Sequence, residues 1–454
     1  MLPLTPRPYQ DATDRKARKA YVDGKRSLLI VAPTGAGKTF MGARFGWGVM
    51  NKGGRTLWVA HRQELVEQAA GEFRKWGMHV GIIAPWAVPV PTAPVQIAMV
   101  QTLLSRGSDA WPAADVVIPD EAHHAVAPSY VPLFRHYQER KSLLIGLTAT
   151  PQRTDGTAMG NVFDVIIESA QPRELIDLGF LVPARVIGPG NITKHLAEHP
   201  VEAYRRFANG QRTIVFCPTV AYARALVPQY AAFGIRAAAI YDKMGAEERR
   251  AAIAAFRAGR LDVLTNQDIL TEGFDCPEVG CVIVARKVGS PSLYTQMLGR
   301  GMRTSPGKTL LTVFDGHANA RLHGLPDQRR EYSLEGTAIQ VAGQGLDSVS
   351  QCPKCGLVFE SSQWKDATCP DCGYVRAARK VRVKPVPVSE IRRADPLADR
   401  TKYLAAQIQK WRWKGKRNAL GIAINTYKGV YGKHGDSGPT QRQVADAITL
   451  AGGI

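Results

Sequence analysis

The sequence predicts an α/β protein with two doubly wound, parallel-sheet domains in tandem, followed by a small four-cysteine module and a short, basic helical tail. Three observations support this prediction. Short runs rich in Val, Ile and Leu recur between helix-compatible segments, the same alternation resumes beyond residue 205, and the composition shifts to Gly, Ser and Gln near Ala342. Continuous hydrophobicity over a strand length is typical of parallel strands that are covered on both faces.

The strands expected in the first domain are residues 27–31, 56–60, 95–100, 116–118 and 143–147, and those in the second are 213–216, 237–240, 262–264, 281–285 and 310–314. A chain of 454 residues with 45% hydrophobic content can bury more than one core. The expected divisions are domain 1 over 1–170, an inter-domain connection over 171–205, domain 2 over 206–345, the four-cysteine module over 350–375, a linker over 376–400 and the tail over 401–454.

The charge of the chain suggests a polyanionic partner. The formal net charge is +20, and the segment from Arg376 to the end holds 17 Lys or Arg against 5 Asp or Glu, which is +12 of that total. A solvated, solubilising tail is the alternative interpretation. No window approaches the apolar length that crosses a bilayer, and residues 1–10 do not resemble a secretory signal. We therefore expect a cytoplasmic protein with no membrane partner.

A phosphate-binding loop is predicted where the apolar run 28–31 meets a helix that begins near Lys38. Backbone N–H groups that converge at a helix N-terminus favour a phosphate, while a lysine and a hydroxyl supply an ammonium and a magnesium ligand. The segment reads Ala32, Pro33, Thr34, Gly35, Ala36, Gly37, Lys38, Thr39. We expect residues 34–39 to bind a nucleoside triphosphate, with Thr39 on Mg²⁺.

Two adjacent carboxylates follow a second buried strand. Asp120 and Glu121 come after residues 116–118, and side chains that succeed one another at a strand end point in different directions. One carboxylate can therefore hold Mg²⁺, for which we expect Asp120, while Glu121 deprotonates the attacking water. A surface acidic turn is the alternative for this tetrapeptide alone. Because Pro119 lacks a backbone donor, we predict that the strand ladder stops at Ile118.

Four cysteines form two similar knuckles that predict a zinc site. Cys352 and Cys355 belong to the same Cys-X-X-Cys-Gly segment. Cys369 and Cys372 form a second segment of this pattern, and 13 residues separate Cys355 from Cys369. Four thiolates at this spacing can surround one tetrahedral Zn²⁺ in a closed, structural site. Two disulfides or an iron centre are the alternatives. The remaining cysteines, at positions 217, 276 and 281, have apolar neighbours and are expected to be buried, reduced thiols.

The tail interleaves aromatic rings with cations. Leu404, Ile408 and Trp411 share one helical face, while residues 420, 424, 427 and 431 share another. Trp411 and Tyr427 fit the core of a helical hairpin, and stacking on unpaired bases is the alternative for both rings. Trp413 falls outside both stripes, so we expect it to be an exposed platform on which an unpaired base can stack.

The motifs, in this order, resemble superfamily 2 helicases and translocases of the DEAH-box type, which have two RecA-like domains. The resemblance covers residues 5–325. Besides the phosphate loop and Asp120-Glu121-Ala122-His123, it includes Arg7-Pro8-Tyr9-Gln10, Ala60-His61-Arg62-Gln63-Glu64-Leu65, Leu147-Thr148-Ala149-Thr150-Pro151, Leu270-Thr271-Glu272-Gly273-Phe274-Asp275 and Gln296-Met297-Leu298-Gly299-Arg300-Gly301-Met302-Arg303.

The resemblance implies roles for single residues. ATP would be contacted by Arg7, Gln10, Gly273 and Asp275 in addition to the phosphate loop, with Gln296, Arg300 and Arg303 acting in catalysis beside Lys38, Asp120 and Glu121. Nucleic acid would be gripped by His61, Arg62, Thr265 and Thr271, and His123, Thr148 and Thr150 would couple the two sites. Arginines three apart on a helix share a face, so both would point into the inter-domain cleft as arginine fingers.

A helicase core followed by a four-cysteine module and a basic tail is similar to RadD-type bacterial and phage repair helicases. The expected function is an ATP-dependent helicase or translocase that uses Mg²⁺ and Zn²⁺ and acts on DNA in repair, recombination or phage replication. Three alternatives remain: an RNA helicase, the motor subunit of a restriction system whose nuclease lies on another chain, and a DNA-binding scaffold that ATP merely switches.

Overall fold

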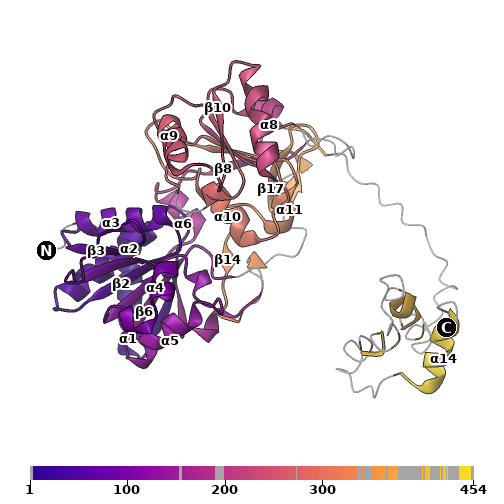
Figure 1. The fold of residues 1–454 in the computed structure, drawn as a ribbon. Coiled ribbons are helices and arrows are strands. Elements are labelled where there is room, and N and C mark those ends of the chain that lie inside the picture. The colour runs from indigo at the N-terminus through magenta and orange to yellow at the C-terminus, as the bar shows by residue number, and fades with distance from the viewer. Residues whose placement is uncertain are drawn as a thin grey trace. The chain divides into compact units, whose positions relative to one another are not determined.

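The chain folds into two compact units, which are described separately: Met1–Ala377 and Ala378–Ile454. Figure 1 shows the course of the chain through their helices and strands. The structure is a computed structural model that describes residues 4–152, 156–189, 199–271, 274–335, 340–341, 349–364, 367–376, 401, 404–409, 420, 423–425, 427 and 439–450.

The first unit begins with a lobe built around a parallel sheet of seven strands in the order β3-β4-β2-β5-β6-β1-β7. The strands are β1 (Ser27–Val31), β2 (Thr56–Ala60), β3 (Val80–Ile83), β4 (Val95–Met99), β5 (Val116–Pro119), β6 (Leu143–Thr148) and β7 (Val165–Glu168). The helices are α1 (Pro8–Val22), α2 (Lys38–Met50), α3 (Gln63–Lys75), α4 (Val100–Arg106) and α5 (Val131–Glu139). We call this region lobe 1.

The central strands of lobe 1 are buried along their length. All five residues of β1 are buried, as are all five of β2, because helices cover both faces of the sheet. Since parallel strands all end at the same edge, the loops that follow β1, β2, β5 and β6 meet there. This edge of the sheet carries the predicted phosphate loop and the paired carboxylates.

A short helix, α6 (Pro172–Asp177), leads into lobe 2, whose sheet has the order β10-β11-β9-β12-β13-β8-β17-β16. Its parallel strands are β8 (Ala184–Ile187), β9 (Thr213–Phe216), β10 (Ala237–Ile240), β11 (Val263–Asn266), β12 (Cys281–Val284) and β13 (Leu311–Asp315). The helices are α7 (Pro200–Phe207), α8 (Val220–Ala231), α9 (Ala246–Arg257), α10 (Pro291–Gly299) and α11 (Asn319–His323). The predicted pair of parallel-sheet domains is therefore present.

The four-cysteine segment extends the sheet of lobe 2, whereas the sequence analysis expects a module of its own. Strands β16 (Val349–Gln351) and β17 (Leu357–Glu360) form a hairpin, and β17 pairs antiparallel with β8 through Val358 and Val186. Gly356 fits closely here, since a Cβ on it would lie 2.7 Å from the carbonyl oxygen of Gly188. Cysteine spacing indicates a local metal site but carries no signal for this long-range pairing.

The prediction that the ladder stops at Ile118 is wrong for the pairing of β5 with β2. Strand β5 continues to Pro119, which lies opposite Val59, and the next N–H, that of Asp120, donates to the carbonyl oxygen of Val59 at 2.9 Å. Successive N–H groups of a strand point to opposite neighbours, so the donor that proline lacks would face β6. The β5–β6 ladder is indeed interrupted after Val117 and resumes only as a bridge between Asp120 and Leu147.

One hydrophobic cluster spans the two lobes. Tyr9, Ala36 and Met41 of lobe 1 belong to the same buried cluster as Val282 and Met297 of lobe 2. The chain also returns to lobe 1 after α11: β14 (Arg330–Glu331) pairs with β15 (Gln340–Val341), and the backbone of Arg330 exchanges hydrogen bonds with the side chain of Gln171. These contacts hold the lobes together in the conformation described.

The second unit is a small helical module with its own core. Leu404, Ile408 and Tyr427 are buried together with Ala447 of the last helix, α14 (Gln441–Leu450). The predicted apolar faces are confirmed for these residues, whereas Trp411, Trp413 and Tyr431 lie outside the described residues. In the part of the chain that the structure describes, we find no helix with the length and apolar character needed to cross a membrane.

Candidate nucleotide site and inter-lobe clefts

The phosphate loop connects β1 to α2 in a left-handed turn. Gly35 and Gly37 have φ angles of 91° and 78°, which residues with a Cβ rarely adopt. Space is restricted as well, because a Cβ on Gly37 would lie 2.6 Å from the Gln10 side chain and one on Gly35 would lie 2.9 Å from Leu181. The Lys38 ammonium, at the start of α2, lies 3.8 Å from a carboxylate oxygen of Glu121.

The start of α1 lies against this loop. The Gln10 amide donates to the carbonyl oxygen of Ala36 at 3.0 Å, and the Tyr9 hydroxyl donates to the same oxygen at 2.8 Å. The Arg7 guanidinium lies 4.3 Å from the ring centre of Phe180, and both residues line the cleft beside the loop. Gln10 thus holds the phosphate loop, while Arg7 and Phe180 offer a cation and a ring to a flat ligand.

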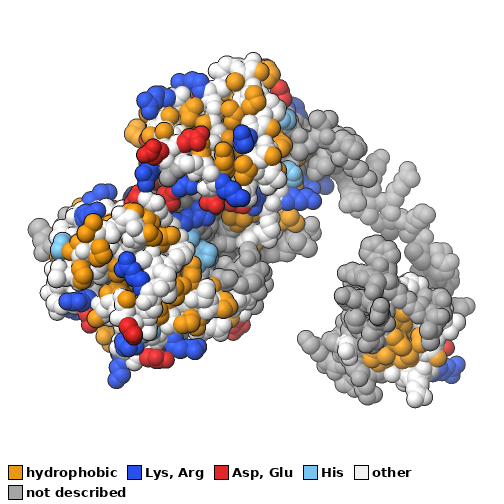
Figure 2. All heavy atoms as spheres, in the orientation of Figure 1, with side chains coloured by type: hydrophobic (Ala, Val, Ile, Leu, Met, Phe, Trp, Pro, Cys, Tyr) orange, Lys and Arg blue, Asp and Glu red, His pale blue; other side chains and the backbone are white. Residues whose placement is uncertain are grey.

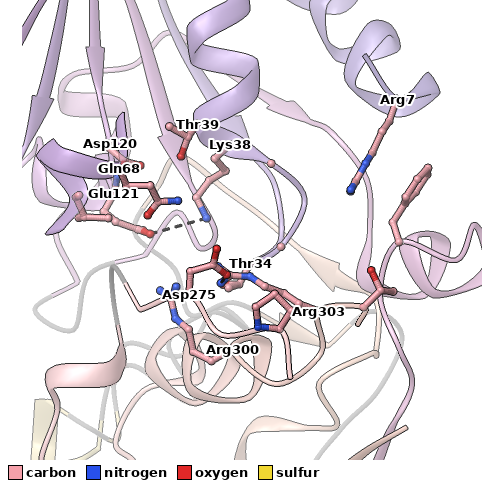
Figure 3. A pocket seen from close by; sticks show the side chains of 16 residues that line it. Arg7, Thr34, Lys38, Thr39, Gln68, Asp120, Glu121, Asp275, Arg300 and Arg303 are labelled. Atoms are coloured by element: carbon pink, nitrogen blue, oxygen red, sulfur yellow. Dashed lines mark hydrogen bonds and ion pairs between the residues drawn. The ribbon is translucent and has the colours of Figure 1, made fainter. Parts of the chain in front are cut away.

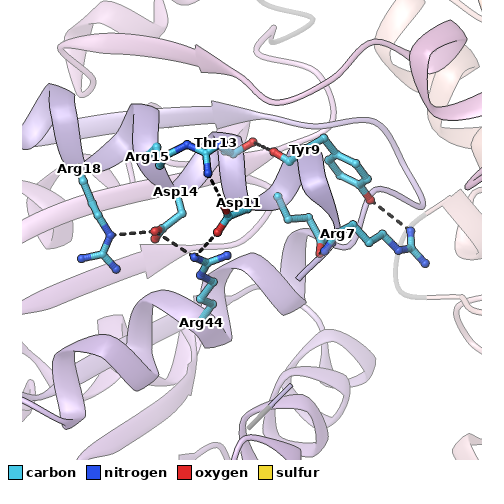
Figure 4. A network of polar contacts seen from close by, with 9 residues as sticks. Arg7, Tyr9, Asp11, Thr13, Asp14, Arg15, Arg18 and Arg44 are labelled. Carbon is cyan, nitrogen blue, oxygen red and sulfur yellow. Dashed lines mark hydrogen bonds and ion pairs between the residues drawn. The ribbon is translucent and has the colours of Figure 1, made fainter. Parts of the chain in front are cut away.

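An ion-pair network around the buried side chains of Arg44 and Asp14 fastens α1 to α2 (Figure 4). Arg44 of α2 donates to Asp11 at 2.7 Å and to Asp14 at 3.2 Å, and Arg18 donates to Asp14 at 2.8 Å. The hydrogen bond from Arg44 lowers the pKa of the Asp11 carboxyl. This network fixes α1, whose N-cap residue is Arg7, against the helix that begins at Lys38.

Glu121 adopts the left-handed conformation, with φ at 47°, directly after β5. This turn separates the two carboxylates: Asp120 accepts the N–H of Glu121 through Oδ1, whereas Glu121 lies between Lys38 and His123. Asp120 and Thr39 both line the cleft, and a carboxylate with a hydroxyl is a donor set that suits Mg²⁺. The residues present therefore fit the predicted magnesium site.

Arginines of lobe 2 close the other side of this cleft, whose volume is about 290 Å³. Figure 3 shows Lys38 and Glu121 on one side and Arg300, Arg303 and Asp275 on the other. Arg300 donates to the carbonyl oxygen of Phe274 at 3.1 Å, and Arg303 donates to the Asp275 carboxylate. Both arginines were expected to point into the cleft between the lobes, and both line it.

The prediction that these arginines share a helix is wrong. Helix α10 ends at Gly299, and Arg303 lies in a bridge with Leu181. Gly301, just beyond the helix, packs closely against β13, where a Cβ would lie 2.4 Å from the Leu311 side chain. Gly299 has a similar constraint, since its Cβ would lie 2.6 Å from Thr34 of the phosphate loop.

Lys308 binds the backbone of the loop, residues 300–303, that carries both arginines. Its ammonium donates to the backbone carbonyls of Gly301 at 2.5 Å, Arg303 at 2.9 Å and Pro277 at 2.9 Å. Desolvation by burial lowers the pKa of Lys308 to about 8. One side chain thereby ties the loop of Arg303 to the segment of Asp275 and Pro277, both of which line the cleft.

Only some of the other predicted nucleotide contacts line the cleft. Asp275 lines the cleft, but Gln296 does not: it is buried on α10, and its amide nitrogen has no hydrogen-bond partner among the described residues. Gly273 lies outside the described residues, and so does the side chain of Thr271. Gln296 therefore contributes to the interior of lobe 2 behind the cleft in this conformation.

The three predicted coupling residues form a continuous polar path. His123 Nδ1 lies 3.5 Å from Glu121 Oε2 and 3.2 Å from the Thr148 hydroxyl. That hydroxyl donates to the carbonyl oxygen of Thr150 at 2.9 Å, and the Thr150 hydroxyl contacts the hydroxyl of Ser292 in lobe 2. Ser292 lies in the first turn of α10, the helix that leads to Arg300.

A second, larger cleft of about 1300 Å³ opens between the lobes, lined by α3 and α9. His61 and Arg62 line it from lobe 1, and Arg62 donates to the carbonyl oxygen of Ile269 at 3.3 Å. Glu64 forms a 3.5 Å ion pair across it with Arg249 of α9. Figure 2 shows basic and acidic side chains gathered where lobe 2 faces lobe 1.

Thr265, a predicted nucleic-acid contact, does not reach this cleft. Its side chain is fully buried in β11, and its hydroxyl donates to the carbonyl oxygen of Ala223 at 2.8 Å. The hydroxyl bonds to α8 because that helix packs against β11, which lies between β10 and β9. This expected contact is therefore not supported, and Trp413, another expected contact, lies outside the described residues.

Several lining residues were missed by the sequence analysis. Gln68 of α3 lines both clefts, as does the predicted Asp275, and Arg250 and Arg257 of α9 line the larger one. The signal for Gln68 was its position on the helix that follows His61 and Arg62, one turn beyond Glu64. The α9 arginines lie in a charged helix that looks like an ordinary solvated surface in the sequence.

The four predicted zinc ligands lie together: Cys352 and Cys355 lie in the loop of the β16–β17 hairpin, and Cys369 and Cys372 lie in the segment that follows it. All four Sγ atoms are within 4.8 Å of one another, with separations of 3.7 Å between Cys352 and Cys372 and 3.8 Å between Cys355 and Cys369. Thiolates bound tetrahedrally to one Zn²⁺ at about 2.3 Å are separated by about 3.8 Å, whereas a disulfide requires about 2.05 Å. The donor set therefore fits zinc.

The other cysteines, Cys217, Cys276 and Cys281, are buried, as predicted. Burial raises the pKa of Cys217 and of Cys281 to about 12, and that of Cys276 to about 11. These thiols are therefore protonated and unreactive near neutral pH.

Comparison with known proteins gives two family matches. Residues 3–153 match the family "Type III restriction enzyme, res subunit", and residues 195–305 match "Helicase conserved C-terminal domain". Their order along the chain agrees with the two lobes. Together the two matches indicate a superfamily 2 helicase, which implies that the chain uses ATP.

Individual relatives extend over more of the chain. A 51.5 kDa protein of a Lactococcus phage (isolate 7-9) is 28% identical over 369 residues, covering 76% of this chain and 77% of the phage protein. The Schizosaccharomyces pombe protein irc3, named as a mitochondrial ATP-dependent helicase, is 28% identical over 343 residues. That match covers 68% of this chain but only 57% of irc3, so this chain spans little more than half of that relative.

Among solved structures, a fragment described as an HsdR subunit of a type I restriction enzyme from Vibrio vulnificus YJ016 has a similar fold. The TM-score is 0.57 at 23% sequence identity, over 73% of this chain and 67% of that one. This likeness supports the two-lobed helicase fold.

Proposed function

We propose that this helicase-type ATP-dependent motor is a DNA helicase or translocase that acts in repair, recombination or phage replication. The observation that carries the proposal is the smaller cleft. There, Lys38 and Glu121 of one lobe face Arg300 and Arg303 of the other, so that a triphosphate bound to the phosphate loop would contact both lobes at once. Such a ligand links its own hydrolysis to the relative position of the lobes.

The roles of the cleft residues follow from their chemistry. Residues 34–39 would bind the phosphates, and Thr39 and Asp120 would hold Mg²⁺, which when bound neutralises phosphate charge. Glu121 would accept a proton from the attacking water. Arg300 and Arg303 would stabilise negative charge that develops on the phosphoryl oxygens, and Lys308 would keep Arg303 in place.

We propose that the adenine base binds beside Arg7 and Phe180, at the edge of the cleft. A guanidinium and an aromatic ring 4.3 Å apart offer stacking surfaces for a base, while Gln10 holds the phosphate loop. We also propose that Gln296 and Gly273, which belong to the motifs of the resemblance, contribute when the cleft closes on ATP.

The larger cleft is the proposed path of the nucleic acid. His61 and Arg62 line it beside arginines of α9, and such groups contact phosphates regardless of base sequence. Thr271 and Trp413 remain proposed contacts by motif and composition. His123, Thr148 and Thr150 would couple the two clefts, since their path runs from Glu121 to α10.

The four-cysteine cluster is proposed to bind one Zn²⁺ with a structural role, because four thiolates leave no open coordination position. With Asp120-Glu121-Ala122-His123, this cluster supports the likeness to DEAH-box and RadD-type helicases. The similarity to a phage protein supports a role in phage or bacterial cells, with a cytoplasmic location.

The decisive experiment measures ATPase rate and strand displacement across single-stranded DNA, duplex DNA, forked DNA and RNA. We expect the largest stimulation with single-stranded or forked DNA and displacement of the annealed strand. Stimulation by RNA alone would indicate an RNA helicase. ATP hydrolysis without strand displacement or movement along DNA would indicate an ATP-switched scaffold.

A second candidate is the motor subunit of a restriction system, favoured by the family model that matches residues 3–153. Such a motor would act on intact double-stranded DNA, which is the substrate of a restriction nuclease. Stimulation of the ATPase by duplex DNA that grows with duplex length, together with no displacement of a short annealed strand, would favour this candidate over the helicase.

A further inference from the structure

Three histidine rings form a row in lobe 1. The ring centres of His123 and His124 lie 4.2 Å apart, with 42° between the planes, and those of His124 and His61 lie 4.4 Å apart, with 56° between the planes. The row arises from the sheet. Strands β2 and β5 are parallel neighbours, so the residues that follow Ala60 and Pro119 meet at the same edge.

The row joins the two clefts. At one end, His123 Nδ1 lies 3.5 Å from Oε2 of Glu121, which lines the smaller cleft. At the other end, His61 lines the larger cleft. Within the described chain, His124 lines neither cleft and is half-buried between the two other rings. Its position is therefore that of a spacer between two functional side chains.

Packing makes the row a mechanical link. Rings with centres closer than about 4.5 Å are in van der Waals contact, so one ring cannot turn without displacing its neighbour. A phosphate that contacts His61 would shift that ring against His124, and His124 would shift His123. His123 is buried and contacts both Glu121 and Thr148, so a small rotation changes how the carboxylate is held.

We propose that His124 is a positioning residue that transmits nucleic-acid binding at His61 to the orientation of Glu121. This inference rests on the proposed function and specifies how the polymer stimulates hydrolysis. The path is distinct from the threonine path, which runs from His123 to α10 of lobe 2. The two paths meet at His123, where the state of the polymer and the position of lobe 2 both act on one carboxylate.

The test compares variants by three measurements: kcat without DNA, kcat with saturating single-stranded DNA, and the Kd for that DNA. His124→Ala should lower the DNA stimulation factor by about 5- to 10-fold, which is in the range of typical coupling between sites. The rate without DNA and the Kd should stay at wild-type values. His124→Phe keeps a flat ring in the row and should restore stimulation.

Two further variants sharpen the result. His136→Ala is the matched control, since His136 is also a half-buried imidazole of lobe 1, packed 4.8 Å from Trp111 and outside both clefts. It should leave all three measurements unchanged. The double variant His61→Ala/His124→Ala should lose no more stimulation than His61→Ala alone, because both residues act in one path.

The inference is overturned if His124→Ala keeps full stimulation, if it lowers the rates with and without DNA equally, or if His124→Phe is as impaired as His124→Ala. The second outcome would indicate general damage to the nucleotide site. Wild-type protein with no DNA stimulation would overturn the proposed function as well. Normal wild-type stimulation with an unaffected His124→Ala variant overturns the inference alone.

Discussion

The two clefts between the lobes differ in size and in how their side chains are held. The smaller, of about 290 Å³, is lined by groups with fixed partners, such as Lys38 with Glu121 and Arg303 with Asp275. The larger, of about 1300 Å³, is lined by charges of both signs from α3 and α9, and one ion pair of 3.5 Å, between Arg249 and Glu64, crosses it. Each ion pair named for the smaller cleft therefore lies within one lobe, whereas the pair in the larger cleft joins the two lobes and depends on their relative position.

This difference fits two kinds of ligand. A triphosphate that must react needs groups in fixed positions, because electrostatic stabilisation depends on geometry set before the reaction. A polymer that must be released at each step is better served by contacts that can be exchanged. Gln68 and Asp275 line both clefts, so the two ligands would share a boundary.

The largest expected effect comes from breaking the smaller cleft alone. Glu121→Gln keeps the size of the side chain but cannot accept a proton, so kcat for ATP hydrolysis should fall by about 10²- to 10⁴-fold. ATP binding and DNA affinity should persist, as measured by nucleotide fluorescence and anisotropy. Near-normal turnover would show that another group activates the water.

The next effect concerns Lys308, which supports the smaller cleft without lining it. Lys308→Met removes the ammonium from three carbonyls and should displace Arg303, lowering kcat by about 10- to 100-fold, as small misplacements can. A KM for ATP that rises instead, with kcat intact, would argue against this role.

The pKa of Lys308 predicts that kcat depends on pH. Because burial lowers this pKa to about 8, raising the pH through 8 neutralises the amine, which then has two N–H donors for three carbonyl oxygens. Wild-type kcat should therefore decline as the pH rises through about 8. The Lys308→Met variant, which has no such group, should show no inflection there.

A smaller effect is expected in the larger cleft. Arg250→Ala removes an exposed cation of α9 and should weaken single-stranded DNA binding by about 5-fold, since one hydrogen bond contributes about 1 kcal/mol. The slope of log Kd against log salt should shrink by about one. The matched control is Arg260→Ala, because Arg260 is exposed just beyond the same helix and outside the cleft. Equal effects of the two variants would point to general electrostatic attraction.

The least effect on turnover is expected from the metal cluster, which lies outside both clefts. Cys352→Ser should abolish bound zinc, measured as about one ion per wild-type chain by atomic emission. The melting temperature should fall by about 4 °C, equivalent to roughly 1–2 kcal/mol. Undiminished zinc content in the variant would exclude the four-thiolate site.

The sequence was a good guide wherever chemistry is local. The ten predicted strands agree with the structure to within two residues, and the phosphate loop, paired carboxylates and both arginines line one cleft. These features are continuous motifs whose residue types follow directly from what a phosphate requires. Strands β3, β7 and β8 were not predicted, although β9, β10 and β12 are equally short. The apolar run is broken by Gly81 in β3 and by Arg185 in β8, which weakens the signal there.

The errors share a physical cause. Pro119, Thr265 and the helix placement of Arg303 all depended on which residue, distant in the sequence, a backbone group or side chain meets. Long-range pairing is set by packing, which a single sequence does not reveal. The His61–His124 contact is of the same kind, since it joins residues that follow two strands separated by more than fifty positions.

The pairing of β17 with β8 makes the cysteine hairpin part of the structural frame of lobe 2. A chain truncated before Val349 would leave β8 as a bare sheet edge, with its N–H and C=O groups open to other chains. A shortened protein that keeps only the two lobes should therefore precipitate or self-associate. Oxidation of the four thiols would disturb the same hairpin and, through the pairing of β17 with β8, the sheet of lobe 2.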